Sequence, residues 1–225
     1  MPLPLGLVED ALMFMVEMTL YYKCTEDPNP TLTADDRPSP SSARDRFVQR
    51  RANQAKYVYA AFSLADLYLG LSWDRASVPS ADRARLRTLR RVGFAVLGLG
   101  SLFRIWAMES LGRFFTFQIA IRKNHKVIKS GPFGLVRHPS YTGVQIMILG
   151  EWLLMQTGNI GQRYLASSSR PSWATILISL LPVALSSVAI LPRLAKEEKM
   201  LVDGLGAEYS RYQVEVPWKL IPGLI

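Results

Sequence analysis

The chain has 225 residues, a length typical of one domain, and 49% of them are hydrophobic. Its mean hydropathy of +0.10 is high for a soluble protein, and the apolar residues are gathered in blocks, which predicts a membrane protein. The net charge of +9 does not indicate nucleic-acid binding, because the arginines lie beside the apolar blocks and no nucleic-acid motif is present. Basic loops that face an anionic membrane surface explain the charge better.

Few cysteine and histidine residues limit the chemistry further. Cys24 is the one cysteine, so no intrachain disulfide can form, and with two histidines a structural zinc site is not expected. Glu9 and Asp10 stand where a secretory signal would be basic, so no cleaved signal peptide is expected. The C-terminal Pro-Gly-Leu-Ile is not a prenylation box.

Apolar blocks predict an all-α membrane bundle of about five spanning helices. The blocks are residues 3–22, 57–73, 92–109, 141–157 and 173–192. The first block carries Asp10 and Glu17, which share a helical stripe, so it either spans with its carboxylates toward other helices or lies at the interface. Gly98 and Gly100 are expected to let helices approach closely.

Charged residues inside the blocks need partners. Asp66 is expected to make a polar contact with another helix. Arg104 is expected to snorkel, although a carboxylate partner such as Glu151 is also possible. The proline-rich stretch 25–46 predicts a disordered loop, and residues 74–91 are polar and rich in arginine.

Basic residues also predict an orientation. The blocks 141–157 and 173–192 form a hairpin, so the stretches 113–140 and 193–225 lie on the same side of the membrane. Both stretches are rich in Lys and Arg, which predicts that this side is cytosolic. The helix at 57–73 has basic loops at both ends, so the same rule does not orient it.

A turn joins the basic stretch to the apolar block at 141–157. Gly131-Pro132 predicts the turn, and Arg137 and His138 precede Pro139. Ser140 is expected to cap the helix that follows. A helix N-terminus beside cationic donors suits a carboxylate or phosphate, but a basic interfacial turn would look the same.

Two further groups lie after the last apolar block. Arg193 and Glu197 share a helix face, and Glu198 follows them. Because Arg before Glu is the weaker order for supporting a helix, Arg193 is a candidate for holding an anionic substrate. Tyr209 and Tyr212 share the face of a helix that is expected to end at Pro217.

These elements resemble the isoprenylcysteine carboxyl methyltransferase family of integral-membrane enzymes. They appear in the order His125-Lys-Val-Ile-Lys-Ser-Gly-Pro-Phe133, Arg137-His-Pro-Ser-Tyr-x-Gly143, Arg193-x-x-x-Glu-Glu198, Gly206-x-Glu-Tyr-x-x-Tyr212 and Val216-Pro217. The resemblance covers residues 113–225, the expected catalytic region, while residues 1–112 are expected to form N-terminal membrane helices.

The resemblance implies methyl esterification of the prenylcysteine carboxylate of prenylated proteins, with S-adenosyl-L-methionine as cofactor. It also implies an endoplasmic reticulum membrane protein whose cytosolic pocket is built from the loop before the RHPSY box and the C-terminal helix. The implied cofactor-binding residues are Gln118, His125, Lys126, Val127, Ile128, Phe133, His138, Pro139, Ser140, Tyr141 and Glu197. Arg193 is the implied substrate-binding residue, and it and Glu197 are the candidate catalytic residues. Phe133 replaces the usual tyrosine, so a hydrogen bond made by that hydroxyl is lost.

Three alternatives remain open at this point. A phospholipid or other lipid methyltransferase carries a similar RHP box, but an amine nucleophile would call for an activating base. An NADPH-dependent membrane sterol reductase shares the tail pattern but is usually longer, with more spans, and the set of Arg193, Glu197 and Glu198 argues against it. The last alternative is a scaffold that kept the fold without the activity. The sequence leaves the natural substrate, the prenyl length and the oligomeric state undetermined.

Overall fold

Long helices make up most of the protein in the computed structural model, which describes residues 5–38, 43–72, 80–158 and 173–224. The helices are α1 (Leu5–Thr25), α2 (Ala43–Ser72), α3 (Ser80–Leu111), α4 (Pro139–Thr157), α6 (Trp173–Leu205) and α7 (Ala207–Glu215). The other elements within the described residues are two 3-10 turns, η2 (Gly112–Phe114) and η3 (Gly131–Gly134), and a short antiparallel pair, β1 (Arg37–Pro38) with β2 (Ala120–Ile121). The predicted all-α class is confirmed.

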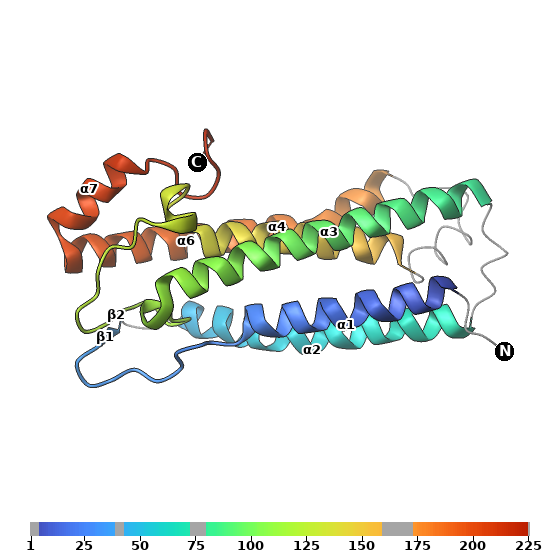
Figure 1. The fold of residues 1–225 in the computed structure, drawn as a ribbon, viewed down its shortest axis with the longest axis horizontal. Coiled ribbons are helices and arrows are strands. Elements are labelled where there is room, and N and C mark those ends of the chain that lie inside the picture. Colours follow the sequence, from blue (N-terminus) through green and yellow to red (C-terminus); the bar gives the residue numbers. More distant parts are fainter. Residues whose placement is uncertain (1–4, 39–42, 73–79, 159–172, 225) are drawn as a thin grey trace.

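Figure 1 shows α1 and α2 side by side below α3, α4 and α6, with α7 and the loop before α4 gathered at one end. Among the described residues, two helical stretches, Ala84–Phe114 and Ser179–Leu205, are long and apolar enough to cross a membrane. The expectation of about five spans stays a prediction. The predicted connection at 158–172 lies, apart from its first residue, outside the described residues.

Helices α2 and α3 begin earlier than the hydropathy pattern predicts. Helix α3 starts at Ser80, inside the stretch expected to be a polar loop, and α2 starts at Ala43. The arginines of this first part of α3 reach carboxylates on the neighbouring helices. Arg91 pairs with Glu9 at 2.6 Å, and Arg90 pairs with Asp66 at 3.0 Å and Asp10 at 3.4 Å. Hydropathy finds only the apolar part of such a helix, because ion pairs rather than lipid satisfy its polar part.

Buried carboxylates of α1 and α2 face other helices. Asp10 and Glu17 are both buried, and Glu17 accepts a hydrogen bond from the Tyr59 hydroxyl at 3.2 Å. The polar contact expected for Asp66 is confirmed by its pair with Arg90. The carboxylate stripe of α1 therefore belongs to the inside of the bundle, which favours the first of the two arrangements considered for residues 3–22.

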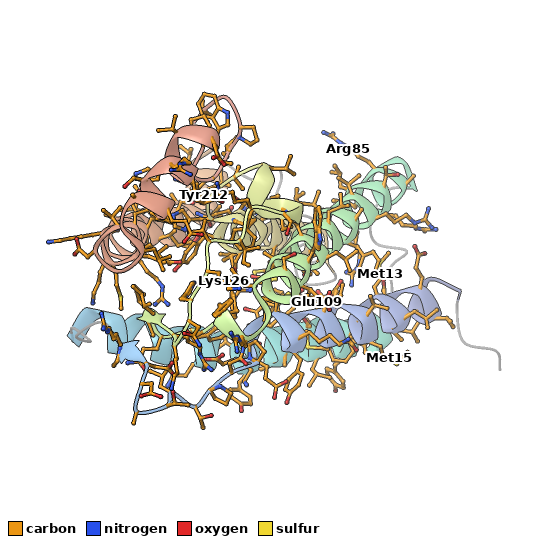
Figure 2. The ribbon with its side chains drawn as sticks, turned by 60° about the vertical axis from the view of Figure 1, so that its left-hand side comes forward. Met13, Met15, Arg85, Glu109, Lys126 and Tyr212 are labelled. Atoms are coloured by element: carbon orange, nitrogen blue, oxygen red, sulfur yellow. The ribbon has the colours of Figure 1, made fainter. Side chains whose placement is uncertain are left out.

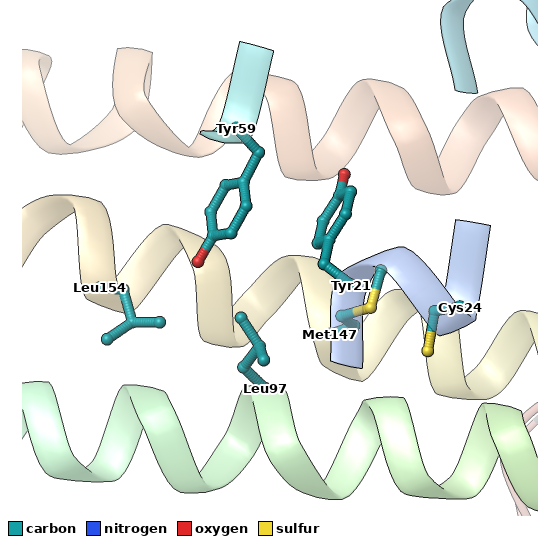
Figure 3. Close-up of a cluster of buried hydrophobic side chains, with 6 residues drawn as sticks. All are labelled: Tyr21, Cys24, Tyr59, Leu97, Met147 and Leu154. Atoms are coloured by element: carbon teal, nitrogen blue, oxygen red, sulfur yellow. The ribbon is translucent and has the colours of Figure 1, made fainter. Parts of the chain in front are cut away.

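The apolar core joins the first four helices. Its buried members are Tyr21, Cys24, Tyr59, Leu97, Met147 and Leu154. Figure 3 shows these side chains gathered between the helices. The rings of Tyr21 and Tyr59 stack with their centroids 4.8 Å apart, which ties α1 to α2.

Small residues set the close approach of α3 and α4. A Cβ on Gly143 would lie 2.8 Å from the carbonyl oxygen of Gly100, so both glycines are needed where the backbones meet. The prediction for Gly100 is thus confirmed. The prediction for Gly98 is wrong, because a Cβ there would meet nothing within 4 Å. Two positions along α3 turn the side chain by about 200°, to the opposite face of the helix.

Replacing Gly150 with alanine is expected to destabilise the fold by about 1–3 kcal/mol, because the helices must move apart to admit the methyl group. The added Cβ would lie 2.6 Å from Leu97 Cα. Gly98→Ala on α3 is the matched control, and it is expected to be neutral or stabilising. Thermal unfolding in detergent measures both variants. Equal melting temperatures for the two would contradict the proposed packing.

The loop between α1 and α2 contacts the segment after α3. Asp27 accepts a hydrogen bond from the Phe117 backbone N–H at 3.0 Å, and Asp36 accepts one from that of Lys123 at 3.0 Å. Backbone donors from Thr33 and Lys123 hold the pKa of Asp36 below its ordinary value. Residues 25–38 of the stretch expected to be disordered therefore support the segment that carries β2.

Candidate active site

A cavity of about 480 Å³ lies where the loop before α4, the first turn of α4, the end of α6 and α7 meet. This volume is in the range of pockets for small organic ligands. In Figure 2, Glu109, Lys126 and Tyr212 mark three of the surrounding elements, which are the end of α3, the loop after β2, and α7. Val144 and Ile190, on α4 and α6, continue the lining with apolar side chains away from the polar end.

Arg137 fastens the C-terminal segment to the turn before α4. Its guanidinium donates to Glu198 Oε1 at 2.8 Å and to the carbonyl oxygens of Val216 and Pro217, each at 2.8 Å. Its backbone N–H donates to the carbonyl of Trp218 at 2.9 Å. Arg137 is buried, so these bonds are shielded from water. The structure thus gives Arg137 a role in shaping the cavity wall.

His138 is the N-cap residue of α4. Its backbone conformation is not helical, as the following proline predicts, and Pro139 itself occupies the first helical position. The imidazole is buried and lies between two carboxylates, with Nε2 3.4 Å from Glu198 Oε1 and Nδ1 3.8 Å from Glu197 Oε1. His138 therefore lies between Glu198, which bonds to Arg137, and Glu197, which lines the cavity.

The expected capping role of Ser140 is wrong. Helix α4 starts at Pro139, two residues before the start that a cap at Ser140 would give, so Ser140 lies in the first turn and His138 is the N-cap. The Ser140 hydroxyl instead accepts a hydrogen bond from Arg104 Nη1 at 2.6 Å.

Arg104 does not snorkel toward the membrane surface, as was expected. Its Nε donates to the carbonyl of Cys24 at 2.8 Å, and its guanidinium lies 5.4 Å from the centroid of the Phe117 ring. Because these partners hold its donors, it is fixed beside the cavity that it lines.

One hydroxyl joins the candidate catalytic residues. The Tyr141 hydroxyl accepts a hydrogen bond from Arg193 Nε at 2.6 Å and donates one to Glu197 Oε2 at 2.9 Å. Arg193 also donates to the carbonyl of Phe117 on the opposite wall. Glu197 keeps 30% of its side-chain surface accessible, so a cation inside the cavity can reach it.

Residues of the loop after β2 form the third wall. His125 stacks on Phe114 with ring centroids 4.6 Å apart, and its Nδ1 lies 3.4 Å from the Arg122 backbone N–H. Among the described residues, the backbone N–H groups of Lys126, Val127 and Ile128 donate to no other backbone group. Unpaired backbone groups beside a cavity can bind the polar edge of a ligand.

Burial lowers the pKa of the His125 imidazole below its ordinary value of 6.5. The unfolded chain therefore takes up this proton before the folded chain does, as the pH falls through about 6.5. His125→Gln is expected to make the melting temperature in detergent less sensitive to acidification from about pH 7.5 to 5.5 than that of the unmodified protein. An unchanged acid sensitivity would contradict a neutral, buried His125.

Phe133 and Tyr212 connect the turn before α4 to α7. The Phe133 ring is buried, and its carbonyl accepts a hydrogen bond from the Tyr212 hydroxyl at 2.8 Å. Tyr209 and Tyr212 pack together, as their shared helix face predicts, with ring centroids 5.7 Å apart. Burial raises the pKa of both hydroxyls, so they stay protonated. Helix α7 ends at Glu215, two residues before Pro217.

All the site residues named from the sequence line this one cavity. They are Gln118, His125, Lys126, Val127, Ile128, Phe133, His138, Pro139, Ser140, Tyr141, Arg193 and Glu197. Sequence reasoning did not place Arg104, Cys24 or Tyr209 in the lining. A charge inside an apolar block was the one available signal for Arg104, and Cys24 gave none.

The structure is that of a helical protein with a cavity at one end of its bundle. Residues 92–167 match the model of the isoprenylcysteine carboxyl methyltransferase (ICMT) family. The resemblance drawn from the RHPSY box is thereby confirmed.

Similar proteins include two that carry the family's name. Protein-S-isoprenylcysteine O-methyltransferase of Schizosaccharomyces pombe is 32% identical over 123 residues, 54% of this chain and 44% of that protein. Protein-S-isoprenylcysteine O-methyltransferase B of Arabidopsis thaliana is 35% identical over 65 residues, 28% of this chain and 33% of that protein. Cobalt-zinc-cadmium resistance protein CzcN of Cupriavidus metallidurans is 33% identical over 111 residues, 49% of this chain and 44% of that protein.

In each case, the matched region spans less than half the length of the relative. Within the described residues, no group of three or more His, Cys, Asp or Glu side chains is placed to hold a metal ion.

Proposed function

We propose that this protein transfers a methyl group from S-adenosyl-L-methionine to the C-terminal carboxylate of prenylated proteins. The observation that carries the proposal is the Arg193–Tyr141–Glu197 arrangement inside a cavity with apolar walls. It offers a guanidinium for the reacting carboxylate and a carboxylate for a cationic donor within one network. The family match supports the same reaction class.

The residues present fit the proposed donor. Glu197 is an accessible carboxylate for the donor's ammonium group, and Phe133 offers an aromatic wall for its base. The backbone N–H groups of Lys126 to Ile128, which donate to no other described backbone group, suit the polar edge of an adenine. Arg137 is not assigned to the donor's carboxylate, because its guanidinium bonds to Glu198 and to the C-terminal segment.

When bound, S-adenosyl-L-methionine supplies an electrophilic methyl group on a sulfonium. The prenylcysteine carboxylate is ionised at neutral pH, so no residue of this chain has to act as a general base. Arg193 orients the carboxylate through charge-assisted hydrogen bonds, and Glu197 holds the donor. Holding the two reactants in line is then the main contribution of the protein to the rate.

The proposed membrane topology follows from the apolar blocks and the basic loops of the sequence. Helices α1, α2, α3, α4 and α6 span the endoplasmic reticulum membrane, and the cavity faces the cytosol. Exposed apolar residues on α6, such as Leu181, Leu185 and Val188, suit contact with lipid. A prenyl chain can then enter from the bilayer along apolar lining residues such as Val144 and Ile190, while its carboxylate reaches Arg193.

Methyl transfer from labelled donor tests the proposal directly. Purified protein in detergent is given a farnesylcysteine analogue or phosphatidylethanolamine. Transfer to the first but not the second supports the proposal, and transfer only to the second identifies a phospholipid methyltransferase. Calorimetry with S-adenosyl-L-methionine and with NADPH separates both from a sterol reductase. Binding of neither cofactor, together with no transfer, supports a scaffold.

A further inference from the structure

Tyr141 stands between the two groups that the proposed reaction needs. Its hydroxyl is 2.6 Å from Arg193 Nε and 2.9 Å from Glu197 Oε2. A phenol has one proton to donate, and here the carboxylate takes it while the guanidinium donates to the oxygen. The hydroxyl is thus oriented by both charged groups at once, and each of them is oriented by it.

The hydroxyl belongs to a different element from the groups that it joins. Arg193 and Glu197 lie one turn apart on α6, whereas Tyr141 lies in the first turn of α4. That turn is also bonded to α3, because the Ser140 hydroxyl accepts a hydrogen bond from Arg104. The Tyr141 backbone N–H also donates to the carbonyl of His138 at 3.1 Å. Tyr141 therefore connects the fixed first turn of α4 to the side chains of Arg193 and Glu197 on α6.

Without this link, both charged side chains could adopt other rotamers. Long flexible side chains lose their orientation when one of few partners is removed, and a reacting carboxylate then aligns less often with the methyl group. Arg193 would keep its bond to the Phe117 carbonyl, but that bond joins it to the opposite wall and does not join it to Glu197.

We propose that Tyr141 is a positioning residue, whose hydroxyl sets the orientation of Arg193 toward the substrate carboxylate and of Glu197 toward the methyl donor. This inference rests on the proposed function. It goes beyond the contact with the cofactor that the family resemblance implies for Tyr141, because the role is exercised through two other side chains.

Tyr141→Phe tests the inference, because it removes the hydroxyl and keeps the ring. We expect kcat/KM for a farnesylcysteine analogue to fall by about 10- to 100-fold, as for the loss of a hydrogen bond to charged groups. The fall should appear in kcat at saturating donor as well as in KM for the analogue. The matched control is Tyr59→Phe, which also removes a tyrosine-to-glutamate hydrogen bond, the one to Glu17, but outside the cavity. It is expected to change the melting temperature and not the kinetic constants.

A double-mutant cycle separates positioning from a direct contact with the donor. If Tyr141 acts through Arg193, adding Tyr141→Phe to Arg193→Lys lowers kcat/KM by much less than the product of the two separate losses. If the double variant instead loses the full product of the two separate losses in kcat/KM, the inference is overturned. A Tyr141→Phe variant that keeps kcat/KM within about twofold, or that loses only donor affinity, would overturn it too.

Donor binding distinguishes failure of the inference from failure of the proposed function. If the unmodified protein methylates no prenylcysteine, the proposed function fails, and calorimetry with S-adenosyl-L-methionine decides the role of Tyr141. A non-additive change in donor Kd between Tyr141→Phe and Glu197→Gln supports positioning of Glu197, and an additive change overturns it. Absence of donor binding by the unmodified protein would overturn both proposals.

Discussion

Arg193→Lys is expected to lower kcat/KM for a farnesylcysteine analogue by about a hundredfold, although the charge is kept. Arginine uses two different nitrogens here, Nε toward the Tyr141 hydroxyl and an Nη toward the Phe117 carbonyl. A lysine ammonium has a single nitrogen and cannot span both partners while it holds a carboxylate. Radiolabelled methyl transfer at saturating donor measures the effect.

The control for this variant is Arg211→Lys. Arg211 is an exposed residue of α7 outside the cavity lining, so the same substitution there is expected to leave kcat and KM unchanged. Donor affinity, measured by calorimetry, is expected to stay near its original value in both variants, because Glu197 is retained. An Arg193→Lys enzyme with unchanged kcat/KM would show that charge alone suffices and would contradict the orienting role.

Arg137→Met is expected to cause the largest loss of stability, about 3–5 kcal/mol, as when one partner of a buried ion pair is removed. The side chains of Arg137 and Glu198 are only 6% and 11% exposed. The substitution leaves Glu198 without that partner and leaves the carbonyls of Val216 and Pro217 without their donor. The C-terminal segment should then detach, and limited proteolysis after α7 should become faster.

Lys129→Met provides the matched comparison. Lys129 and Glu215 also pair, at 2.6 Å, but their side chains are 39% and 45% exposed. Exposed pairs contribute about 0–1 kcal/mol, so this variant should unfold close to the temperature of the unmodified protein. Equal losses for the two methionine variants would mean that the buried network around Arg137 does not hold the C-terminal segment.

The two glutamates after Arg193 show where sequence reasoning stops. Glu197 and Glu198 are adjacent and chemically alike, and the sequence groups them together. In the structure, Glu197 lines the cavity, while Glu198 accepts hydrogen bonds from Arg137 and Lys219 and supports the wall. The reason is that adjacent residues of a helix point about 100° apart, so their roles depend on what packs against each face.

Arg104 and Ser140 illustrate the same limit over a longer distance. Each was interpreted from its immediate neighbours, as a snorkelling arginine and a helix cap, and both interpretations were wrong. The two side chains bond to each other across 36 positions of sequence. Such a pair depends on the close approach of α3 and α4, which local propensity does not describe.

The sequence by itself determined the helical class, the resemblance to the ICMT family, and twelve of the residues that line the cavity. These features follow from composition and from motifs, because a motif places particular residue types at a fixed spacing. Only the tertiary structure decided which carboxylate faces the cavity, that Arg137 holds the C-terminal segment, and that one hydroxyl joins Arg193 to Glu197. The physical reason is that hydrogen bonds act over about 3 Å, so partners distant in sequence are defined only once the helices have packed.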